Sequence, residues 1–223
     1  MEATTASGEG RSLTFVNNKL ASLLAFAPLT IWTVIHVWNN LSVFKGAEAW
    51  QSSVTTHQHP IALLATTIVV LLPLVLHTVW GIKRLRSSRP NNTRYGYFEN
   101  LKYLLQRASA VGVLLFIGAH LWLAFLHPRL QEGRPEAFAD IASQMHHHTP
   151  TLLVYLLGTL GVAYHLGNGI SGFAWSWGIT SSRKAVMTAQ KVGVAFFLIL
   201  LAMCWAAIFG LWQAGATLPV VAH

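Results

Sequence analysis

The sequence predicts an all-α integral membrane protein built as a bundle of five transmembrane helices. Of its 223 residues, 53% are hydrophobic and only 10% are charged, whereas a soluble domain carries about 25% charge. In addition, five apolar stretches reach the roughly 20 helical residues that cross a hydrocarbon core. These stretches are residues 20–43, 61–85, 104–126, 151–177 and 191–212.

One membrane domain, residues 20–213, accounts for nearly the whole chain. We expect an amino-terminal segment, 1–19, in front of it and a short tail, 214–223, behind it. The first apolar stretch is too long for the apolar region of a signal peptide, although Ala25-Phe26-Ala27 resembles a cleavage site. It is therefore predicted to be a retained helix.

The distribution of basic residues predicts the orientation, because cytoplasmic loops are enriched in Lys and Arg. Only Lys45, Arg129 and Arg134 fall on one side of the predicted bundle, and the other twelve of the fifteen basic residues fall on the opposite side. The amino terminus is thus predicted to be cytoplasmic and the carboxyl terminus external, in a multi-pass protein of the cell inner (cytoplasmic) membrane. The same distribution explains the net charge of +8 better than nucleic-acid binding does. The basic face could also dock a soluble partner.

Four histidines, one in each of four apolar stretches, are the most informative residues, because an ionisable group in lipid is costly and usually functional. At about 1.5 Å of rise per residue, His36 and His120 lie roughly 23 to 24 Å from the cytoplasmic helix ends. His77 and His165 lie roughly 10 to 14 Å from them. The sequence therefore predicts two histidine pairs at two depths. Two such pairs are what two six-coordinate haem irons require, which indicates electron transfer across the membrane.

Other uses of these histidines remain open. A single intramembrane histidine can simply bond a neighbouring helix, and a haem-free anchor or transporter is an alternative of a different class. A zinc site or a proton relay needs carboxylates or closely spaced ligands. The seven acids all lie outside the predicted spanning stretches, which disfavours a carboxylate-based pump or metal-ion transporter: Glu2, Glu9, Glu48, Glu99, Glu132, Glu136 and Asp140.

The neighbours of His165 and His77 suit a flat cofactor. Glycines on the face of His165 leave either a slot for a haem or a seam for helix packing, and the slot is favoured; they are Gly158, Gly161, Gly169 and Gly172. Arg84, seven residues after His77, either pairs with a haem propionate or anchors the cytoplasmic helix end. Pro73 is expected to kink its helix.

Cysteine usage excludes several redox cofactors from this chain. The one cysteine, Cys204, lies in the fifth apolar stretch, so covalent haem attachment and an iron-sulfur cluster are both ruled out. The haems are therefore expected to be non-covalent b haems. No glycine-rich dinucleotide-binding turn is found, and FAD or iron-sulfur chemistry must belong to other subunits.

Several runs resemble the dihaem cytochrome b membrane anchor of succinate dehydrogenase and fumarate reductase, over about residues 11–213. These runs are Ser12-Leu13, Lys19-Leu20, Pro28-Leu29 and His36; Arg94-Tyr95-Gly96-Tyr97, Leu105-Gln106-Arg107 and His120-Leu121-Trp122; and Tyr164-His165-x-x-Asn168-Gly169-Ile170 with Trp175-Ser176-Trp177-Gly178-Ile179-Thr180. The resemblance implies two haems b, a quinone, and flavoprotein and iron-sulfur subunits on the cytoplasmic face.

The resemblance also implies a path for electrons that can run in either direction. Electrons from succinate would pass through the flavoprotein and the iron-sulfur protein to the inner haem, the outer haem and a quinone, typically menaquinone, bound near the outer haem. Fumarate reduction would use the same path in reverse, and of the two directions succinate oxidation is favoured. The membrane anchor of a nitrate reductase is the alternative identification within electron transfer. The complex could also form homo-oligomers.

Candidate residues for the quinone site lie on the outer side, since a quinone needs an apolar slot with a few polar groups. His127, two turns beyond His120, is the most attractive, with a solvated interfacial histidine as the alternative. The other candidates are Asn40, Gln51 and Trp50, then Asn39, Glu48, His57 and His59. Residues 146–148, three histidines, are interpreted as a loop rather than a metal site. Because Ala163 and its helix offer no carboxylate, we expect quinone reduction to exchange protons outside without a compensating acid path.

Overall fold

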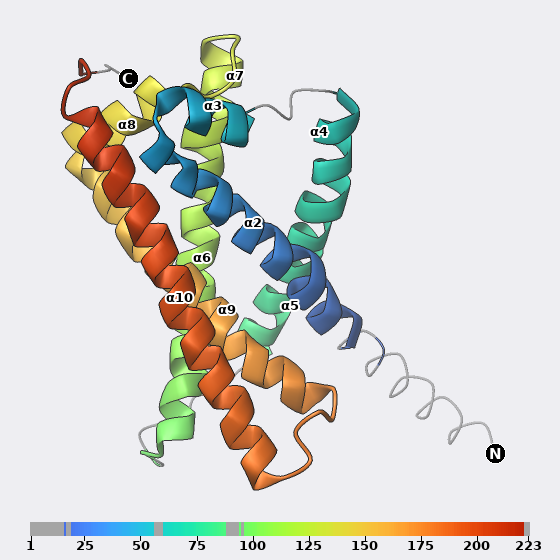
Figure 1. Ribbon diagram of the computed structural model, residues 1–223. Coiled ribbons are helices and arrows are strands. Elements are labelled where there is room, and N and C mark those ends of the chain that lie inside the picture. The colour runs from blue at the N-terminus through green and yellow to red at the C-terminus, as the bar shows by residue number, and fades with distance from the viewer. Residues whose placement is uncertain (1–15, 17–18, 56–59, 88–93, 95, 221–223) are drawn as a thin grey trace.

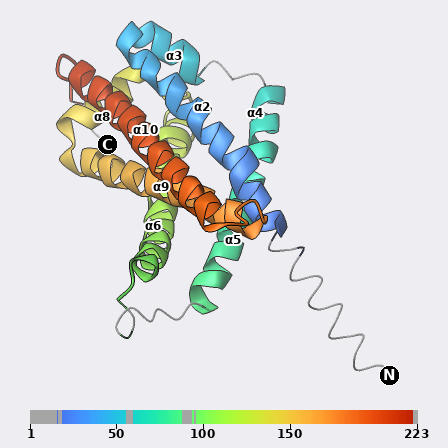
Figure 2. The same cartoon turned by 60° about the horizontal axis from the view of Figure 1, so that its bottom comes forward.

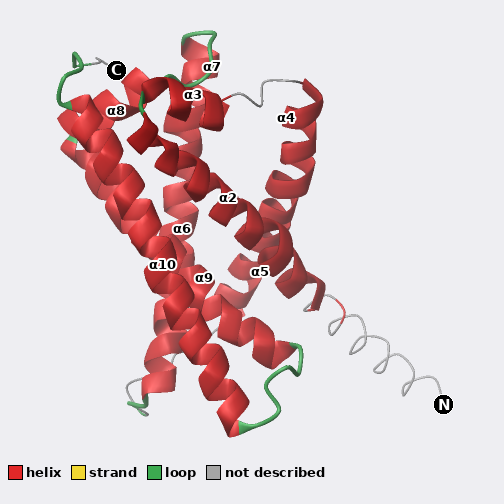
Figure 3. Cartoon of the chain, viewed as in Figure 1, coloured by secondary structure: helices red, strands yellow, loops and turns green. Residues whose placement is uncertain are grey.

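The computed structural model describes residues 16, 19–55, 60–87, 94 and 96–220, and this part of the chain is helical throughout apart from short connections (Figures 1 and 3). Five of its helical segments are long and apolar enough to cross a membrane. These are Lys19–Lys45, Leu64–Ser87, Phe98–Gln131, Thr149–Ser176 and Arg183–Gly215. The predicted all-α, five-span architecture is confirmed.

The first three spans are each assembled from several helical pieces, whereas the last two are single helices. The first continues from residues 19–24 through η1 (Ala25–Thr30), α2 (Ile31–Asn40) and η2 (Leu41–Lys45), and α3 (Ala47–Thr55) follows it. The second comprises α4 (Pro60–Thr66), η3 (Thr67–Leu71) and α5 (Leu72–Ser87). The third comprises α6 (Phe98–Leu121), η4 (Trp122–Leu126) and α7 (His127–Gln131). After α8 (Phe138–His147) come α9 (Thr149–Ser176) and α10 (Arg183–Gly215).

The helices extend past the apolar stretches that predicted them. The third span begins at Phe98 rather than at residue 104, and the fifth begins at Arg183 rather than at residue 191. The prediction that the acids stay clear of the spans is wrong for Glu99, which lies in the first turn of α6. An acid is favourable there because it faces the positive end of the helix dipole, and Glu99 also pairs with Lys102 at 2.8 Å.

The three π-helical segments, η1, η3 and η4, each lie at a proline. Pro28 is inside η1, while Pro73 and Pro128 follow η3 and η4 by two residues. Proline lacks the N–H that an α-helix needs and clashes with the preceding turn, and a widened turn relieves that clash. The irregularity predicted around Pro73 is present as η3.

Helix α9 is at the centre of the packing, with α10 along one side of it and α6 along another (Figures 1 and 2). Val37 of α2 joins the buried cluster of Ala163, Leu200 and Cys204 between α9 and α10. The second span contributes little to the core, because its described residues bury only Val70 and Pro73. Helix α4 stands away from α8 and α10 in both views.

The end of the bundle opposite the basic loops carries a second core, which short helices α3 and α8 complete. Its buried residues are Val43, Trp50, Ile141, Ala142, Met145, Ile208 and Leu211. His146 and His147 end α8, so their interpretation as a loop is wrong. Their rings bond the carbonyls of Trp212 at 2.9 Å and Leu218 at 3.0 Å, which satisfies polar groups at the end of α10. Among the described residues, no group of three or more His, Cys, Asp or Glu could hold a metal ion.

Candidate functional site

The four intramembrane histidines meet in the two predicted pairs. The rings of His36 on α2 and His120 on α6 have centroids 5.8 Å apart and planes inclined by 72°. The rings of His77 on α5 and His165 on α9 have centroids 6.3 Å apart, also inclined by 72°. The pairing derived from depth alone is therefore confirmed as a spatial arrangement.

The separation of each pair matches that of two ligands on opposite sides of one metal ion. A coordinating imidazole nitrogen lies about 2 Å from its metal, and about 1 Å more reaches the ring centre, so opposed rings have centres about 6 Å apart. Two histidines facing each other in this way provide the two axial positions of a haem iron. The donor set of each pair thus fits a haem with two imidazole ligands.

The ring of His165 is held by polar side chains of α6. Its Nδ1 lies 3.2 Å from Gln106 Nε2 and 3.3 Å from Ser109 Oγ. Gln106 also donates to the carbonyl of His165 at 3.2 Å and accepts a hydrogen bond from Asn168 at 2.8 Å. A metal-binding histidine donates its second ring N–H to an acceptor, and of these two neighbours the hydroxyl of Ser109 can accept while the amide nitrogen of Gln106 can only donate.

The other three histidines have different surroundings. His120 Nδ1 lies 3.0 Å from the hydroxyl of Tyr155 on α9, and His36 stacks on Trp32 with ring centroids 4.6 Å apart. His77 Nδ1 is buried without a hydrogen-bond partner in the described part of the chain. Such an unsatisfied group is costly in an apolar interior, and a ligand that binds the ring would offset this cost.

The glycine row on the His165 face divides into two parts. At Gly169 and Gly172, no heavy atom lies within 4 Å of where a Cβ would be, so these positions border open space. A Cβ at Gly161 would lie 3.8 Å from the side chain of Val113 on α6, and a Cβ at Gly158 would overlap the ring of Phe116. Open space and a packing contact therefore both occur, at different positions along the row.

One close approach of two helices involves a glycine pair that was not singled out from the sequence. A Cβ at Gly167 of α9 would be 2.7 Å from the carbonyl oxygen of Gly193 in α10. Ala163 and Gly167, four residues apart, form the small-xxx-small pattern typical of close helix packing in membranes. That spacing was the available signal.

Three predicted quinone-site residues make hydrogen bonds in two separate sets. Trp50 Nε1 donates to Asn40 Oδ1 at 3.2 Å, and Asn40 donates to the carbonyl of His36 at 2.9 Å. Gln51 donates to the carbonyl of Glu136 at 2.9 Å and accepts from the backbone N–H of Phe138 at 2.7 Å. These contacts join α2 and α3 to the start of α8, and Trp50 is only 2% exposed.

His127 does not share these hydrogen bonds, and it lies with acidic and basic side chains at the carboxyl-terminal end of the third span. Its Nδ1 is 3.8 Å from Glu132. Arg129 pairs with Glu136 at 2.7 Å, while Arg134 pairs with Asp140 at 2.7 Å and also with Glu132. The pKa of Arg134 is raised, chiefly by its hydrogen bond to Asp140. His57 and His59 lie outside the described residues.

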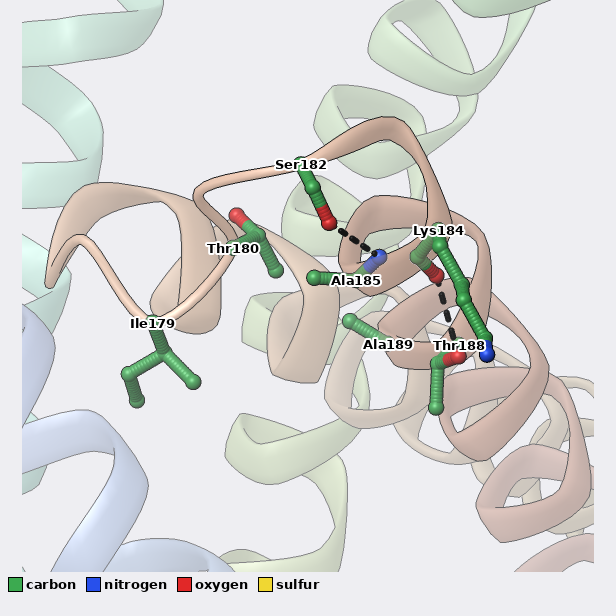
Figure 4. Close-up of a pocket in the computed structure, with 7 residues that line it drawn as sticks. All are labelled: Ile179, Thr180, Ser182, Lys184, Ala185, Thr188 and Ala189. Carbon is green, nitrogen blue, oxygen red and sulfur yellow. Dashed lines mark hydrogen bonds between the residues drawn. The ribbon is translucent and has the colours of Figure 1, made fainter.

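The opposite, basic end of the bundle has a pocket of about 450 Å³ where α9 connects to α10 (Figure 4). Its walls come from this connection and the first turns of α10, where Ser182 accepts a hydrogen bond from the N–H of Ala185 at 3.2 Å. The lining residues are Ile179, Thr180, Ser182, Lys184, Ala185, Thr188 and Ala189. None is one of the paired histidines. Arg84 lies exposed in the last turn of α5, a place compatible with both roles predicted for it.

Comparison with known proteins agrees with this arrangement. Residues 86–209 match the model of the family described as succinate dehydrogenase/fumarate reductase transmembrane subunit. The chain is also 28% identical, over 189 residues, to the succinate dehydrogenase cytochrome b558 subunit of Bacillus subtilis (strain 168). That similarity covers 83% of this chain and 91% of the Bacillus protein. The chain is therefore a multi-pass membrane protein of the succinate dehydrogenase/fumarate reductase transmembrane subunit family, and it serves an enzyme complex whose dehydrogenase chemistry lies outside this chain.

Proposed function

We propose that the chain is the dihaem cytochrome b anchor of a succinate:quinone oxidoreductase and conveys electrons from an iron-sulfur subunit to a membrane quinone. The observation that carries this proposal is the pairing of four histidines from four spans, with ring centroids 5.8 Å and 6.3 Å apart. The Bacillus relative is named as a succinate dehydrogenase subunit, which favours succinate oxidation over fumarate reduction.

His36 and His120 would hold the outer haem b, and His77 and His165 the inner one. A b haem bound in this way supplies reversible one-electron transfer at a potential that its ligands and surroundings set. The chain itself binds and orients the two groups. Gly169 provides open space beside His165, Gly161 borders the same face, and Arg84 would pair with an inner propionate.

The quinone is proposed to bind on the outer side, near the first histidine pair. His127 and Asn40 are the polar groups proposed to contact its carbonyls, and menaquinone is the expected species. Trp50 and Gln51 have their polar atoms in bonds within the protein, so they would act by holding Asn40 and α3 in place. Ala163 is fully buried by apolar neighbours, which supports proton exchange at the outside without an acid path through α9.

The partner subunits are proposed to dock on the basic, cytoplasmic end. One large apolar side chain, Ile179 in the connection between α9 and α10, is 64% exposed there, close in sequence to Arg183 and Lys184. Exposed apolar surface outside the lipid is typical of protein interfaces. FAD and the iron-sulfur clusters would reside only in the flavoprotein and iron-sulfur subunits.

The proposal is tested by spectra of the purified complex before and after addition of succinate. We expect two haems per chain, both reduced by succinate. His165→Ala should remove the inner haem and stop electron entry, whereas His120→Ala should spare reduction of the inner haem and stop quinone reduction. His148→Ala is a matched control, because this exposed histidine belongs to neither pair and its ring lies 2.7 Å from the hydroxyl of Thr151. Colourless wild-type complex, or His120→Ala with both haems unchanged, would refute the proposal.

A further inference from the structure

Tyr155 connects α9 to the outer histidine pair. Its hydroxyl oxygen lies 3.0 Å from His120 Nδ1, across the interface between α9 and α6. We propose that Tyr155 is a positioning residue for His120: the phenol oxygen accepts a hydrogen bond from Nδ1–H and leaves Nε2 to bind a haem iron. This inference rests on the proposed function, because it requires a metal at His120.

The direction of this hydrogen bond follows from the chemistry of imidazole. A neutral ring carries one hydrogen, so one nitrogen donates and the other offers a lone pair. If Nε2 of His120 binds a metal, the hydrogen is on Nδ1, and the oxygen of Tyr155 is its acceptor. The opposite arrangement, with Tyr155 as donor, would put the hydrogen on Nε2 and block the metal.

The phenol is fixed in place by its neighbours. Phe116 packs edge-to-face on Tyr155, with ring centroids 5.4 Å apart, and stacks on His120 at 5.7 Å. Gly158, three residues after Tyr155, makes room for Phe116, because a Cβ at this glycine would overlap its ring. The glycine, the phenylalanine and the tyrosine thus form a fitted support for one face of His120.

The inner pair also has a hydroxyl next to Nδ1 of one histidine, but here the histidine is on α9 and the hydroxyl is on α6. Ser109 of α6 donates its hydroxyl hydrogen to the carbonyl of Gln106 at 3.0 Å. Its oxygen, 3.3 Å from His165 Nδ1, therefore remains as an acceptor for Nδ1–H. The amide nitrogen of Gln106, which can only donate, also lies 3.2 Å from His165 Nδ1. The choice of tautomer by a hydroxyl acceptor is therefore proposed for His120 and not for His165.

The hydrogen bond has an electronic consequence besides its effect on orientation. An acceptor on Nδ1–H makes the imidazole a stronger electron donor to its metal, and stronger donation favours the oxidised iron. Removal of the acceptor is therefore expected to raise the reduction potential of the outer haem and to leave the inner haem unchanged.

The test is a redox titration of both haems in the intact complex carrying Tyr155→Phe, with electron paramagnetic resonance of the oxidised protein. At a fixed potential, the reduced-to-oxidised ratio of the outer haem should rise by roughly threefold to tenfold, where tenfold equals about 59 mV for one electron. Tyr164→Phe is the matched control, because the hydroxyl of Tyr164 lies on the same helix and is buried without a hydrogen-bond partner among the described residues. It should leave both haems unchanged.

Several outcomes separate the possibilities. A shift confined to the outer haem, or loss of the outer haem alone, supports the role of Tyr155. An outer haem that titrates as it does in Tyr164→Phe would overturn it, and so would loss of both haems, which indicates a general structural role. A wild-type complex without haem would instead refute the proposed function on which the inference rests.

Discussion

The seam between α9 and α10 offers the sharpest test of the packing. A Cβ at Gly167 would lie 2.7 Å from the Gly193 carbonyl oxygen and 2.7 Å from the Phe197 Cβ, where ordinary contacts begin at 3.4 Å. Gly167→Ala therefore needs a separation of about 0.7 Å between two backbones, since neither contact is with the flexible end of a side chain.

The expected cost follows from two opposing effects. Overpacking of this kind costs about 1 to 3 kcal/mol, while alanine gains up to about 1 kcal/mol over glycine in a helix interior. With the full gain from alanine, a net destabilisation of up to about 2 kcal/mol remains, which lowers the melting temperature by up to roughly 8 °C in a chain of this size. Thermal unfolding of purified protein, followed by circular dichroism, measures the change.

Gly112→Ala is the matched control for this substitution. Gly112 lies inside α6, and no heavy atom is within 4 Å of where its Cβ would be. The alanine should therefore leave the melting temperature unchanged or raise it slightly, through helix propensity alone. A Gly167→Ala protein that melts as high as Gly112→Ala would refute the close approach of α9 and α10.

Three further predictions concern Gln51, Arg134 and the two histidine pairs. Gln51→Ala should lower the free energy of unfolding by about 1 to 3 kcal/mol, because it leaves the Glu136 carbonyl and the Phe138 N–H without their partner; a melt unchanged from wild type would contradict this. The pKa of Arg134 is raised, chiefly by its hydrogen bond to Asp140. The stability that charged Arg134 gives to the folded protein is therefore present below the ordinary guanidinium pKa, and it is lost only as the pH rises through the raised pKa. The destabilisation by Arg134→Gln should thus be equal at mildly acidic and mildly alkaline pH, and an effect that vanishes at mildly alkaline pH in paired melts would count against it. With both ring pairs inclined by 72°, the oxidised haems should give strongly anisotropic low-spin resonance signals, and ordinary rhombic spectra would indicate near-parallel rings instead.

The five spans and the histidine pairs could be predicted because both depend on position along one dimension. Span length follows from apolar content, and depth follows from the rise per residue along each helix. His36 and His120 meet because they have equal depths on neighbouring helices, and no knowledge of side-chain packing is needed. The same reasoning pairs His77 with His165.

The second core, which includes residues of the short helices α3 and α8, could not be predicted in this way. Helices α3 and α8 are short and flank the spans, and isolated short helices depend on tertiary packing rather than on propensity. Trp50 and Gln51 consequently looked like available quinone-site residues, whereas the structure places one in a core cluster and the other in bonds between α3 and α8. His146 and His147 were misinterpreted as part of a loop for the same reason, whereas His148 does lie between α8 and α9.

Helix α9 uses two different kinds of interaction on its two faces. Towards α10 it presents Ala163 and Gly167, which allow close contact through shape. Towards α6 it presents Tyr155, His165 and Asn168, all of which hydrogen-bond side chains of that helix. Polar groups in lipid must find partners within the protein, so these bonds hold α6 and α9 in one register. Substitutions on the α10 face should therefore change stability first, and substitutions on the α6 face should change the geometry of the histidine pairs.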